Sequence, residues 1–553
     1  MSRPTTSPAP TTGERDGSHV YDETVLLLQE RASNGAQPSS NSTNLSVGVH
    51  YASYILGPLK SRIQRELGTS HAEFGVLFSA YGLNSTWTPL VAGLLVSRLG
   101  TTFTSILATG TIFLGQVILL IGERVGSIRL MALGLFTFGF GATPLAVVQE
   151  TIVVRFFKSH GLGVSMAFGL IAGKASSFVA ARTSYPLMEH FGSSAPFYVA
   201  AFLTGFSFAI NLVYITCSRW LVDGAGAELE APDLIHDARH TAPTDLARAQ
   251  VLTEIAEKRK VRLAEIAKLG DLFWVYILLN IWCGMIWSPF SQLAANIIEK
   301  RYKLTEEEAA TKASYLLAGS MILYPIVRYA KGCNLSTVLM RKTKCGLVVD
   351  RHNNKPIATN LLMLSSLLTG FTYTWLVIAP VWTSTPTPGI ISFALGYGFA
   401  PLLLVVIVPK VVDHKYVSTA LGAHKSVEQT GTILFQTLAG LSLDITSKGG
   451  SNAASVQRLL NTFLFLNALH MLSIFLLAHL QSLRTNSKAR AQERAQSSTQ
   501  GSQDTSSQEQ TSLNEVRRGK IFTTLAATLV VTAWILFLGT AYYRLGRKSV
   551  LSN

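Results

Sequence analysis

Ionisable residues lie inside several long apolar stretches of the sequence, and their positions define the chemistry that the chain could perform. Lys174 occurs thirteen residues into one such stretch, about 20 Å from its start in a helix that rises 1.5 Å per residue. A charge near the centre of a bilayer costs roughly 2.5–3.5 kcal/mol even on lenient scales, so it marks a candidate functional residue. A lysine at that depth can bind an anion such as a carboxylate, or backbone carbonyls can stabilise it without any ligand.

A second group of ionisable residues, His424, Lys425 and Glu428, occurs in a later apolar stretch. Lys425 and Glu428 are three residues apart, which places their charges on one face of a helix, where they neutralise each other. His424 titrates near neutral pH in an unperturbed environment. The group is interpreted either as a proton-coupling or gating cluster or as an intrahelical ion pair near one mouth of the bundle. Glu150, at the end of another stretch, is a candidate gate residue or a solvated helix end.

Two tryptophans, Trp282 and Trp287, are candidates to line a cavity, although most aromatic residues in a helical bundle serve packing. We find no nucleophile–base constellation, so the sequence does not indicate an enzyme. The four cysteines have no CxxC spacing and predict neither a disulfide framework nor a zinc site; they are Cys217, Cys283, Cys333 and Cys345. No metal or cofactor is expected.

The composition is typical of a membrane protein. Of the 553 residues, 48% are hydrophobic and 14% are charged, whereas a soluble globular chain carries roughly 25% charged residues. Long apolar stretches of about 20 residues match the hydrocarbon thickness of a bilayer. A soluble enzyme is therefore excluded. The net charge of +15 is attributed to membrane topology, because basic residues set orientation, and a nucleic-acid partner is not expected.

The apolar stretches are arranged as six, a polar linker, six, a second polar linker, and one. The first is too short to cross a bilayer unaided, and the eighth is marginal. The thirteen stretches are 46–58, 74–96, 101–122, 128–153, 161–183, 195–216, 271–295, 313–329, 357–379, 388–408, 418–440, 459–480 and 520–542.

The connections between these stretches orient the chain in the membrane. With a cytosolic N-terminus, the even-numbered connections carry more than twice as many Lys and Arg as the odd-numbered ones, which places the even ones in the cytosol. Two six-helix halves with a cytosolic linker outline a secondary transporter built from repeats. The expected organisation is a disordered cytosolic tail (1–45), an N-terminal transmembrane half (46–216), a cytosolic linker (217–270), a C-terminal half (271–480), a disordered linker (481–519) and an extra transmembrane helix with a short tail (520–553).

A short motif recurs after corresponding helices of the two halves. It reads Gly93-x3-Ser97-Arg98-x-Gly100 in the first half and Gly346-x3-Asp350-Arg351 in the second. The pattern resembles the signature G-x3-D-R/K of the major facilitator superfamily. The resemblance implies an all-α polytopic fold of two six-helix pseudo-repeats, in which the motif latches cytosolic helix ends. Ser97 replaces the aspartate of that family, so the first copy of the latch is incomplete.

Three further segments are similar to the branch of this superfamily that contains the lysosomal dipeptide uniporters. They are GFGATPLAVVQETIVVRFF, FWVYILLNIWCGMIWSPF and STALGAHKSVEQTGTILFQTLAGLSLD. The resemblance implies that Lys174 stands where the branch carries a substrate-binding arginine. It also implies that Thr143 stands where the branch places a glutamate that receives the ammonium group of a peptide. A hydroxyl cannot supply that charge, so a monocarboxylate-like anion fits these residues at least as well as a dipeptide.

Two irregularities favour an alternative function. Residues 328–345 carry five Lys or Arg and no acid, and they interrupt the eighth helix as an insertion or a basic loop. The first helix is truncated. Together with the missing aspartate at position 97, these features leave open a receptor or scaffold of the same fold that does not transport. The primary expectation is a secondary transporter of a small organic solute, with the lipid bilayer and that solute as its partners.

The N-terminal tail contains a candidate sorting signal. Asp22, Leu26 and Leu27 fit the acidic dileucine pattern, which sorting adaptors recognise in cytosolic tails. The sequence therefore favours a vacuolar or lysosomal membrane, with the plasma membrane as the second choice.

Overall fold

The structure is a computed structural model that describes residues 47–157, 162–225, 263–323, 357–412, 416–449, 452–497 and 504–551. These residues form helices joined by short turns, and no strand occurs among them. Candidate residues outside these ranges include Gly346, Asp350 and Arg351, the insertion at 328–345 and the sorting signal at Asp22, Leu26 and Leu27.

The N-terminal half begins with a short helical stretch at residues 47–54. Ser70 and Glu73 form a capping box at the start of the helix that crosses next, which satisfies backbone N–H groups that have no partner in the helix. A left-handed glycine at position 126 (φ 70°) ends the following helix, as is common at helix C-termini. The elements are α3 (Lys60–Leu67), α4 (His71–Leu83), η1 (Asn84–Thr86), α5 (Thr88–Val125), α6 (Ile128–Phe157), α7 (Leu162–Phe191) and α8 (Ala195–Ala225).

The chain reverses direction within α5. Val91 and Thr111 line the same cavity, whereas twenty residues of straight helix would separate them by about 30 Å. Leu95 and Thr104 also line this cavity, so the turn lies between them. The sequence predicts a connection between two spans at this place, and the first copy of the motif, with Gly93, Arg98 and Gly100, lies at this turn.

The C-terminal half repeats the arrangement. The long helix at its start carries acidic Asp271 in the first turn and basic Lys300 and Arg301 in the last, which complements the helix dipole. The elements are η2 (Leu263–Lys268), α11 (Gly270–Tyr302), α12 (Glu306–Leu323), α16 (Ile357–Val377), α17 (Pro380–Thr383), α18 (Thr387–Val411), α19 (Val417–Gly449) and α20 (Asn452–Ser497).

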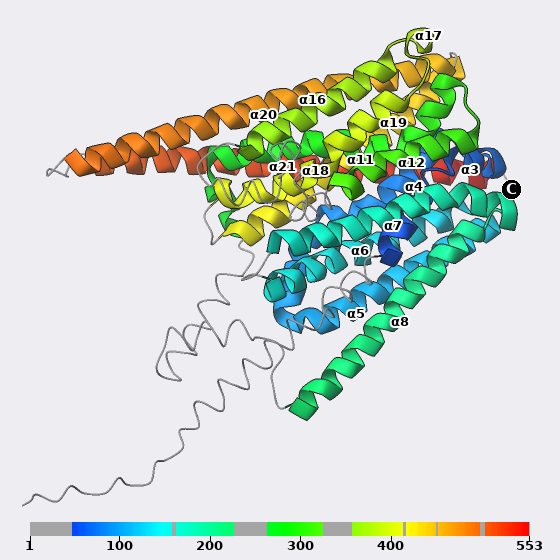
Figure 1. The fold of residues 1–553 in the computed structure, drawn as a ribbon, viewed down its shortest axis with the longest axis horizontal. Coiled ribbons are helices and arrows are strands. Elements are labelled where there is room, and N and C mark those ends of the chain that lie inside the picture. Colours follow the sequence, from blue (N-terminus) through cyan, green and yellow to red (C-terminus); the bar gives the residue numbers. More distant parts are fainter. Residues whose placement is uncertain are drawn as a thin grey trace, which may run out of the picture.

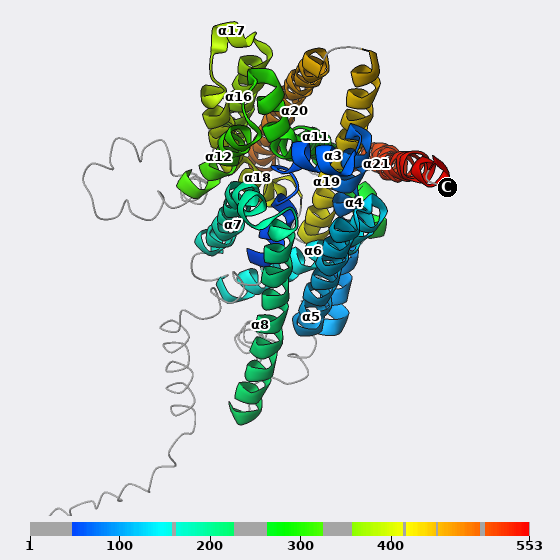
Figure 2. The same ribbon diagram turned by 90° about the vertical axis from the view of Figure 1, so that its right-hand side faces the viewer.

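Each half has a hydrophobic core. One core joins residues of α11, α12, α16, α18, α19 and α20. The other joins residues of the first helical stretch and α3 to α8, together with Ile433 and Leu434 of α19 and Ala533 and Phe537 of α21. The helices of the two halves approach each other at the end of the bundle that contains α3 and diverge toward the opposite end (Figure 1). Figure 2 shows the bundle from the end that contains α3. We call the closed end the α3 end.

A final helix, α21 (Asp504–Leu551), packs against both halves. It contacts α4 in the first half and α11 and α19 in the second. The indole Nε1 of Trp534 donates a hydrogen bond to Thr86 Oγ1 at 3.0 Å, and Arg518 pairs with Asp271 at 2.6 Å. The extra transmembrane helix expected over 520–542 therefore lies against the junction of the two halves.

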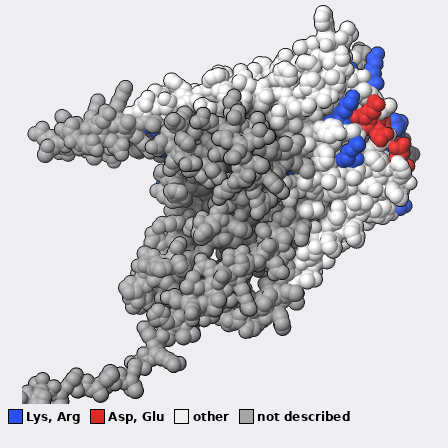
Figure 3. Space-filling model, viewed as in Figure 1, with Lys and Arg blue, Asp and Glu red and all other residues white. Residues whose placement is uncertain are grey.

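Length and hydropathy identify eight described helices or helix segments that can cross a membrane, fewer than the thirteen stretches taken from the sequence. The eight are counted over the described residues only; the helix α4 has 13 residues there, and in α19 the polar side chains of His424, Lys425 and Glu428 lower the mean hydropathy. On the face drawn in Figure 3, charged side chains gather at the α3 end, and the remaining described surface is uncharged. Such a surface suits contact with lipid.

One part of the expected organisation differs from the structure. Residues 481–519, which we expect to be disordered, are helical over 481–497 and again over 504–519. The first part continues α20 and the second begins α21. Ala, Gln, Arg, Glu and Lys are frequent there, and these residues have high intrinsic helix propensity.

Candidate functional site

Lys174 of α7 and Tyr397 of α18 meet between the two halves of the bundle. The Lys174 ammonium donates a hydrogen bond of 2.9 Å to the Tyr397 hydroxyl. The same ammonium lies 4.4 Å from the centroid of the Tyr397 ring, which is within the range of a cation–π interaction. Tyr397 is 9% exposed. The lysine predicted to bind an anion is therefore held by an aromatic residue of the other half and not by a carboxylate.

Small residues of α7 allow the first helical stretch to lie beside Lys174. A Cβ atom on Gly173 would fall 2.7 Å from His50 Nε2, so a larger residue there would require the imidazole to move. Ser177 donates to the carbonyls of Gly173 and His50, at 3.0 and 3.4 Å. His50 and Tyr54 both interact electrostatically with Lys174. The short first helix thus contributes directly to the surroundings of the lysine.

The second predicted group forms a connected cluster on α19. Lys425 Nζ lies 3.0 Å from Glu428 Oε2, and His424 Nε2 lies 3.6 Å from the same oxygen. The other nitrogen of His424 is 2.9 Å from the Tyr276 hydroxyl, which donates to the carbonyl of Leu404. His424 is buried, whereas the Lys425 side chain is 42% exposed. The three residues therefore join a buried hydrogen-bond network to an accessible cation.

The lysine of α7 and the α19 cluster belong to one electrostatic site. Glu428 interacts electrostatically with Lys174 as well as with Lys425, and Tyr397 interacts with both Lys425 and Glu428. A cation of the N-terminal half and a carboxylate of the C-terminal half therefore interact electrostatically, and Tyr397 interacts with both. The sequence predicted both groups but did not predict that they share a site.

The two candidate tryptophans differ in their surroundings. Trp287 is buried, and its ring centroid lies 5.6 Å from that of Tyr397 and 5.7 Å from that of His470. Its Nε1 has no hydrogen-bond partner among the described residues, which is unusual for a buried indole. His470 is held by Ser366 and Cys283, at 3.0 and 3.3 Å. Trp282 is partly buried against the C-terminal core and makes no polar contact with the site in the described structure.

The remaining predicted residues are placed as follows. Thr143 is hydrogen-bonded to Ser85 at 2.6 Å, and the part of the chain described here shows no contact between it and Lys174. Glu150 lies in α6, and Gly93, Arg98 and Gly100 lie in α5, but their side chains are outside the described set. No group of three or more His, Cys, Asp or Glu that could hold a metal occurs among the described residues.

Polar contacts between the halves close the α3 end. Arg65 of α3 forms a bidentate pair with Glu306 of α12, at 2.6 and 3.2 Å. The backbone N–H of His71 donates to Asp444 Oδ1 at 2.7 Å. Other hydrogen bonds between the halves at this end join Ser61 to Glu299 and to Asn296, and Arg182 to Thr311. An aqueous path from this end to Lys174 would have to break these contacts.

Sequence reasoning missed Tyr397 and the residues that close the α3 end. A tyrosine in the middle of a predicted span carries a polar group that needs a partner when buried, and this signal was present in the span at 388–408. The closing residues had no such signal, because Arg65, Glu299 and Glu306 lie near helix ends, where charged residues are ordinary.

The fold, the pseudo-repeat and the midplane cation define a class of membrane transporter. The chain matches the model of the Major Facilitator Superfamily over residues 45–436, more than half of its length, and it belongs to this family. It is therefore an integral membrane transporter of a small molecule and not an enzyme.

Among characterised relatives, the chain is similar to the lysosomal dipeptide transporter MFSD1 of Mus musculus. The two are 23% identical over 421 residues, which cover 73% of this chain and 79% of the mouse protein. The Homo sapiens protein of the same name is 22% identical over 413 residues, covering 72% of this chain and 78% of the relative.

Solved structures confirm the fold. A point mutant of the nucleoside transporter NupG is 14% identical with a TM-score of 0.56, covering 80% of this chain and 100% of that one. The POT family transporter PepTSo is 12% identical with a TM-score of 0.57, covering 81% and 98%. At these identities the similarity concerns the fold alone.

Proposed function

We propose that the chain transports a small organic solute with a carboxylate group by alternating access, and that Lys174 binds this carboxylate. The observation that supports the proposal is the position of Lys174, which bonds Tyr397 across the interface of the halves. A carboxylate would replace the neutral hydroxyl as acceptor and add the attraction of opposite charges to the hydrogen bond from the ammonium. The rocking of one half against the other would then expose this site alternately to each side.

Glu428 makes a dipeptide a plausible substrate despite the neutral residue at position 143. Its carboxylate interacts with Lys174 electrostatically and would receive the ammonium group of a zwitterion. The Lys425 ammonium, which is 42% exposed, would turn away from Glu428 when a substrate cation takes its place. The activity for which the MFSD1 relatives are named agrees with this class of substrate.

A monocarboxylate is the second candidate. The ion pair between Lys425 and Glu428, at 3.0 Å, neutralises the carboxylate and leaves Lys174 as the cation that would bind the solute. In that case Glu428 and His424 would serve proton coupling or gating. The two candidates differ in whether the ammonium group of the solute contributes to affinity.

The orientation and the cellular address are part of the proposal. With a cytosolic N-terminus, the α3 end faces away from the cytosol. The described state would therefore be closed to the non-cytosolic side of the membrane. The dileucine pattern at Asp22, Leu26 and Leu27 and the lysosomal relatives support a vacuolar or lysosomal membrane. Sorting adaptors that recognise this pattern would then be cytosolic partners of the chain.

Uptake into proteoliposomes tests the proposal. The full chain is reconstituted and offered dipeptides and monocarboxylates, each with a membrane potential and with a pH gradient. Lys174→Ala serves as the site variant, and Lys303→Ala serves as the control because Lys303 is exposed at the end of α11. We expect saturable uptake of one class that Lys174→Ala abolishes and Lys303→Ala retains. Binding without uptake by the folded chain would instead support the non-transporting receptor.

A further inference from the structure

The helix α21 carries small residues at every seventh position of the face that packs on the bundle. They are Gly519, Ala526, Ala533 and Thr540. Ala533 and Thr540 are buried, and Ala526 packs against the C-terminal core. A Cβ atom on Gly519 would overlap the carbonyl oxygen of Ala267 in η2. Since small residues let helices approach closely in a membrane, this face is adapted to lie along the bundle.

The part of α21 that is farthest from the α3 end rests on the C-terminal half. Arg518 forms a bidentate pair with Asp271 of α11, at 2.6 and 3.2 Å. The ring centroids of Phe522 and Trp274, also of α11, lie 5.9 Å apart. This part of the helix can therefore move with the C-terminal half as one body.

The part of α21 that is nearer to the α3 end contacts both halves. Phe537 is buried in the core of the N-terminal half, and the indole of Trp534 donates to Thr86 Oγ1 at 3.0 Å. Arg544 pairs at 3.4 Å with Asp444 of α19, in the C-terminal half. Figure 2 shows α21 beside α4 and α19, which belong to different halves. This part of the helix therefore crosses the seam between the halves.

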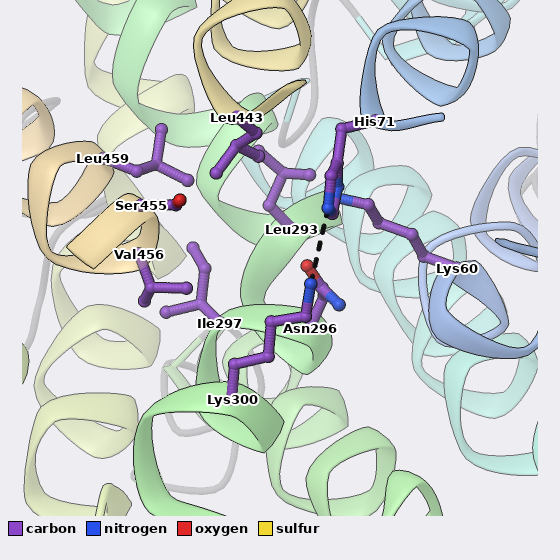
Figure 4. Close-up of a pocket in the computed structure, with 10 residues that line it drawn as sticks. All are labelled: Lys60, His71, Leu293, Asn296, Ile297, Lys300, Leu443, Ser455, Val456 and Leu459. Carbon is purple, nitrogen blue, oxygen red and sulfur yellow. Dashed lines mark hydrogen bonds between the residues drawn. The ribbon is translucent and has the colours of Figure 1, made fainter. Parts of the chain in front are cut away.

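Opening of the α3 end would separate the groups that this part of α21 contacts. The backbone N–H of His71 in α4 donates to Asp444 Oδ1 of α19 at 2.7 Å. The His71 imidazole accepts a hydrogen bond of 3.5 Å from Lys300 of α11 (Figure 4). Both contacts join the halves, so both break when the α3 end opens. The helix cannot then keep Phe537 in the N-terminal half and Arg544 on Asp444 at the same time.

We propose that α21 is a strap that holds the α3 end closed. Opening this end costs the contacts of α21 with one of the two halves. The opposite end opens without this cost, because the part of α21 there rests on the C-terminal half. The strap therefore shifts the equilibrium toward the state that is closed at the α3 end. This role rests on the alternating access of the proposed function, in which the α3 end has to open once in each cycle.

Accessibility of the α3 end tests the strap without a known substrate. Ser79 is a buried residue of α4, and its hydroxyl lies 2.9 Å from that of Thr437 in α19. A cysteine at this position becomes accessible when the two helices separate. The full chain with Ser79→Cys, in which the four native cysteines are replaced, is placed in lipid nanodiscs. The rate of labelling by a membrane-impermeant thiol reagent then reports the population of the open state.

Two pairs of matched variants separate the strap from general packing of α21. Arg544→Gln and Phe537→Leu remove contacts of the part that crosses the seam, and both changes are mild enough to retain the fold. Arg518→Gln and Phe522→Leu make the same changes in the part that rests on the C-terminal half. We expect Arg544→Gln to raise the labelling rate about two- to fivefold and Phe537→Leu to raise it up to about tenfold. Arg518→Gln and Phe522→Leu should leave the rate unchanged.

The outcomes distinguish the strap from the proposed function. If Ser79→Cys is labelled at a measurable rate that neither Arg544→Gln nor Phe537→Leu raises, the strap is overturned and alternating access stands. Equal increases in all four variants would also overturn the strap, because α21 would then support the fold in general. No labelling of Ser79→Cys in any folded variant would show that the α3 end does not open, which overturns the strap and alternating access together.

Discussion

Lys174 and Tyr397 join the two halves of the transporter by a hydrogen bond of 2.9 Å between ammonium and hydroxyl. The bond lies at the substrate site proposed above, and a cation–π contact of 4.4 Å accompanies it. A carboxylate that enters the site competes with the tyrosine oxygen for the ammonium, while the ring can keep its contact. Under the proposed function, substrate binding and the contact between the halves would therefore be coupled through the Lys174 side chain.

Tyr397→Phe removes the hydroxyl that orients the lysine and keeps the ring. A hydrogen bond of this kind contributes about 0.5–1.5 kcal/mol net, and a substrate carboxylate has to displace it, so we expect KM for uptake to fall about three- to tenfold. The maximal rate should remain near that of the unaltered chain. Tyr315→Phe is the matched control, because Tyr315 is 48% exposed. An unchanged or raised KM in Tyr397→Phe would show that the hydroxyl does not compete with substrate for Lys174.

Glu428 decides between the two substrate classes. Its loss alone would leave Lys425 unpaired, so the informative variant is the double substitution Lys425→Gln/Glu428→Gln, which keeps the site neutral. If Glu428 receives an ammonium group, the lost charge-assisted bond is worth about 1.5–3 kcal/mol. We then expect kcat/KM for a dipeptide to fall about 10- to 100-fold and that for a monocarboxylate to change little. Equal losses for both substrates would assign the pair to gating or coupling.

Sequence patterns were sufficient for the fold and for the polar residues within each span. Apolar length and the repeated motif determine the number and order of most helices, and the spacing of Lys425 and Glu428 predicts their ion pair. Each of these inferences depends on neighbours within about one turn of helix. The reversal within α5 follows in the same way, because the motif marks the connection between two spans.

Contacts between helices distant in sequence could not be predicted in this way. Tyr397 meets Lys174 across 223 residues of chain, and the Arg65–Glu306 pair spans 241. No local pattern encodes such a distance, since it depends on how two separately formed bundles dock. The helical ends of α20 and α21 were missed for another reason: polar composition was interpreted as disorder although the residues favour helix.

The Arg65–Glu306 pair should contribute to closure of the α3 end. We expect Arg65→Glu to favour the open state and the exchange Arg65→Glu/Glu306→Arg to restore closure. Because Arg65 is 63% exposed, the pair is worth about 0.2–1 kcal/mol, a shift of about two- to fivefold. The readout is labelling of Ser79→Cys, a buried position of α4, by a membrane-impermeant thiol reagent. The four native cysteines are replaced in this background. A labelling rate of Ser79→Cys that is the same with and without Arg65→Glu would contradict the prediction.

Closure of the α3 end should also weaken in acid because of His71. Lys300 donates to His71 Nε2, and this contact requires the neutral imidazole. Burial, together with the charges of Lys60 and Lys300, lowers the pKa of His71 from 6.5 to about 3. The closed state thus binds the proton more weakly than an open state in which water reaches the ring. The stability that the neutral His71 gives the closed state relative to the open state is complete above pH 6.5. It is lost progressively as the pH falls toward about 3.

At about pH 5 the difference in pKa corresponds to a shift of about 30-fold toward the open state. Below about pH 6 Lys60 adds little, because its lowered pKa of about 7 leaves it protonated in both states. Labelling of Ser79→Cys between about pH 6 and about pH 5, normalised to an exposed cysteine, measures the part of the shift that falls in this range. His71→Gln should remove the pH dependence, and His190→Gln, an exposed histidine of α7, should retain it. A profile unaffected by His71→Gln would place the pH response elsewhere in the chain.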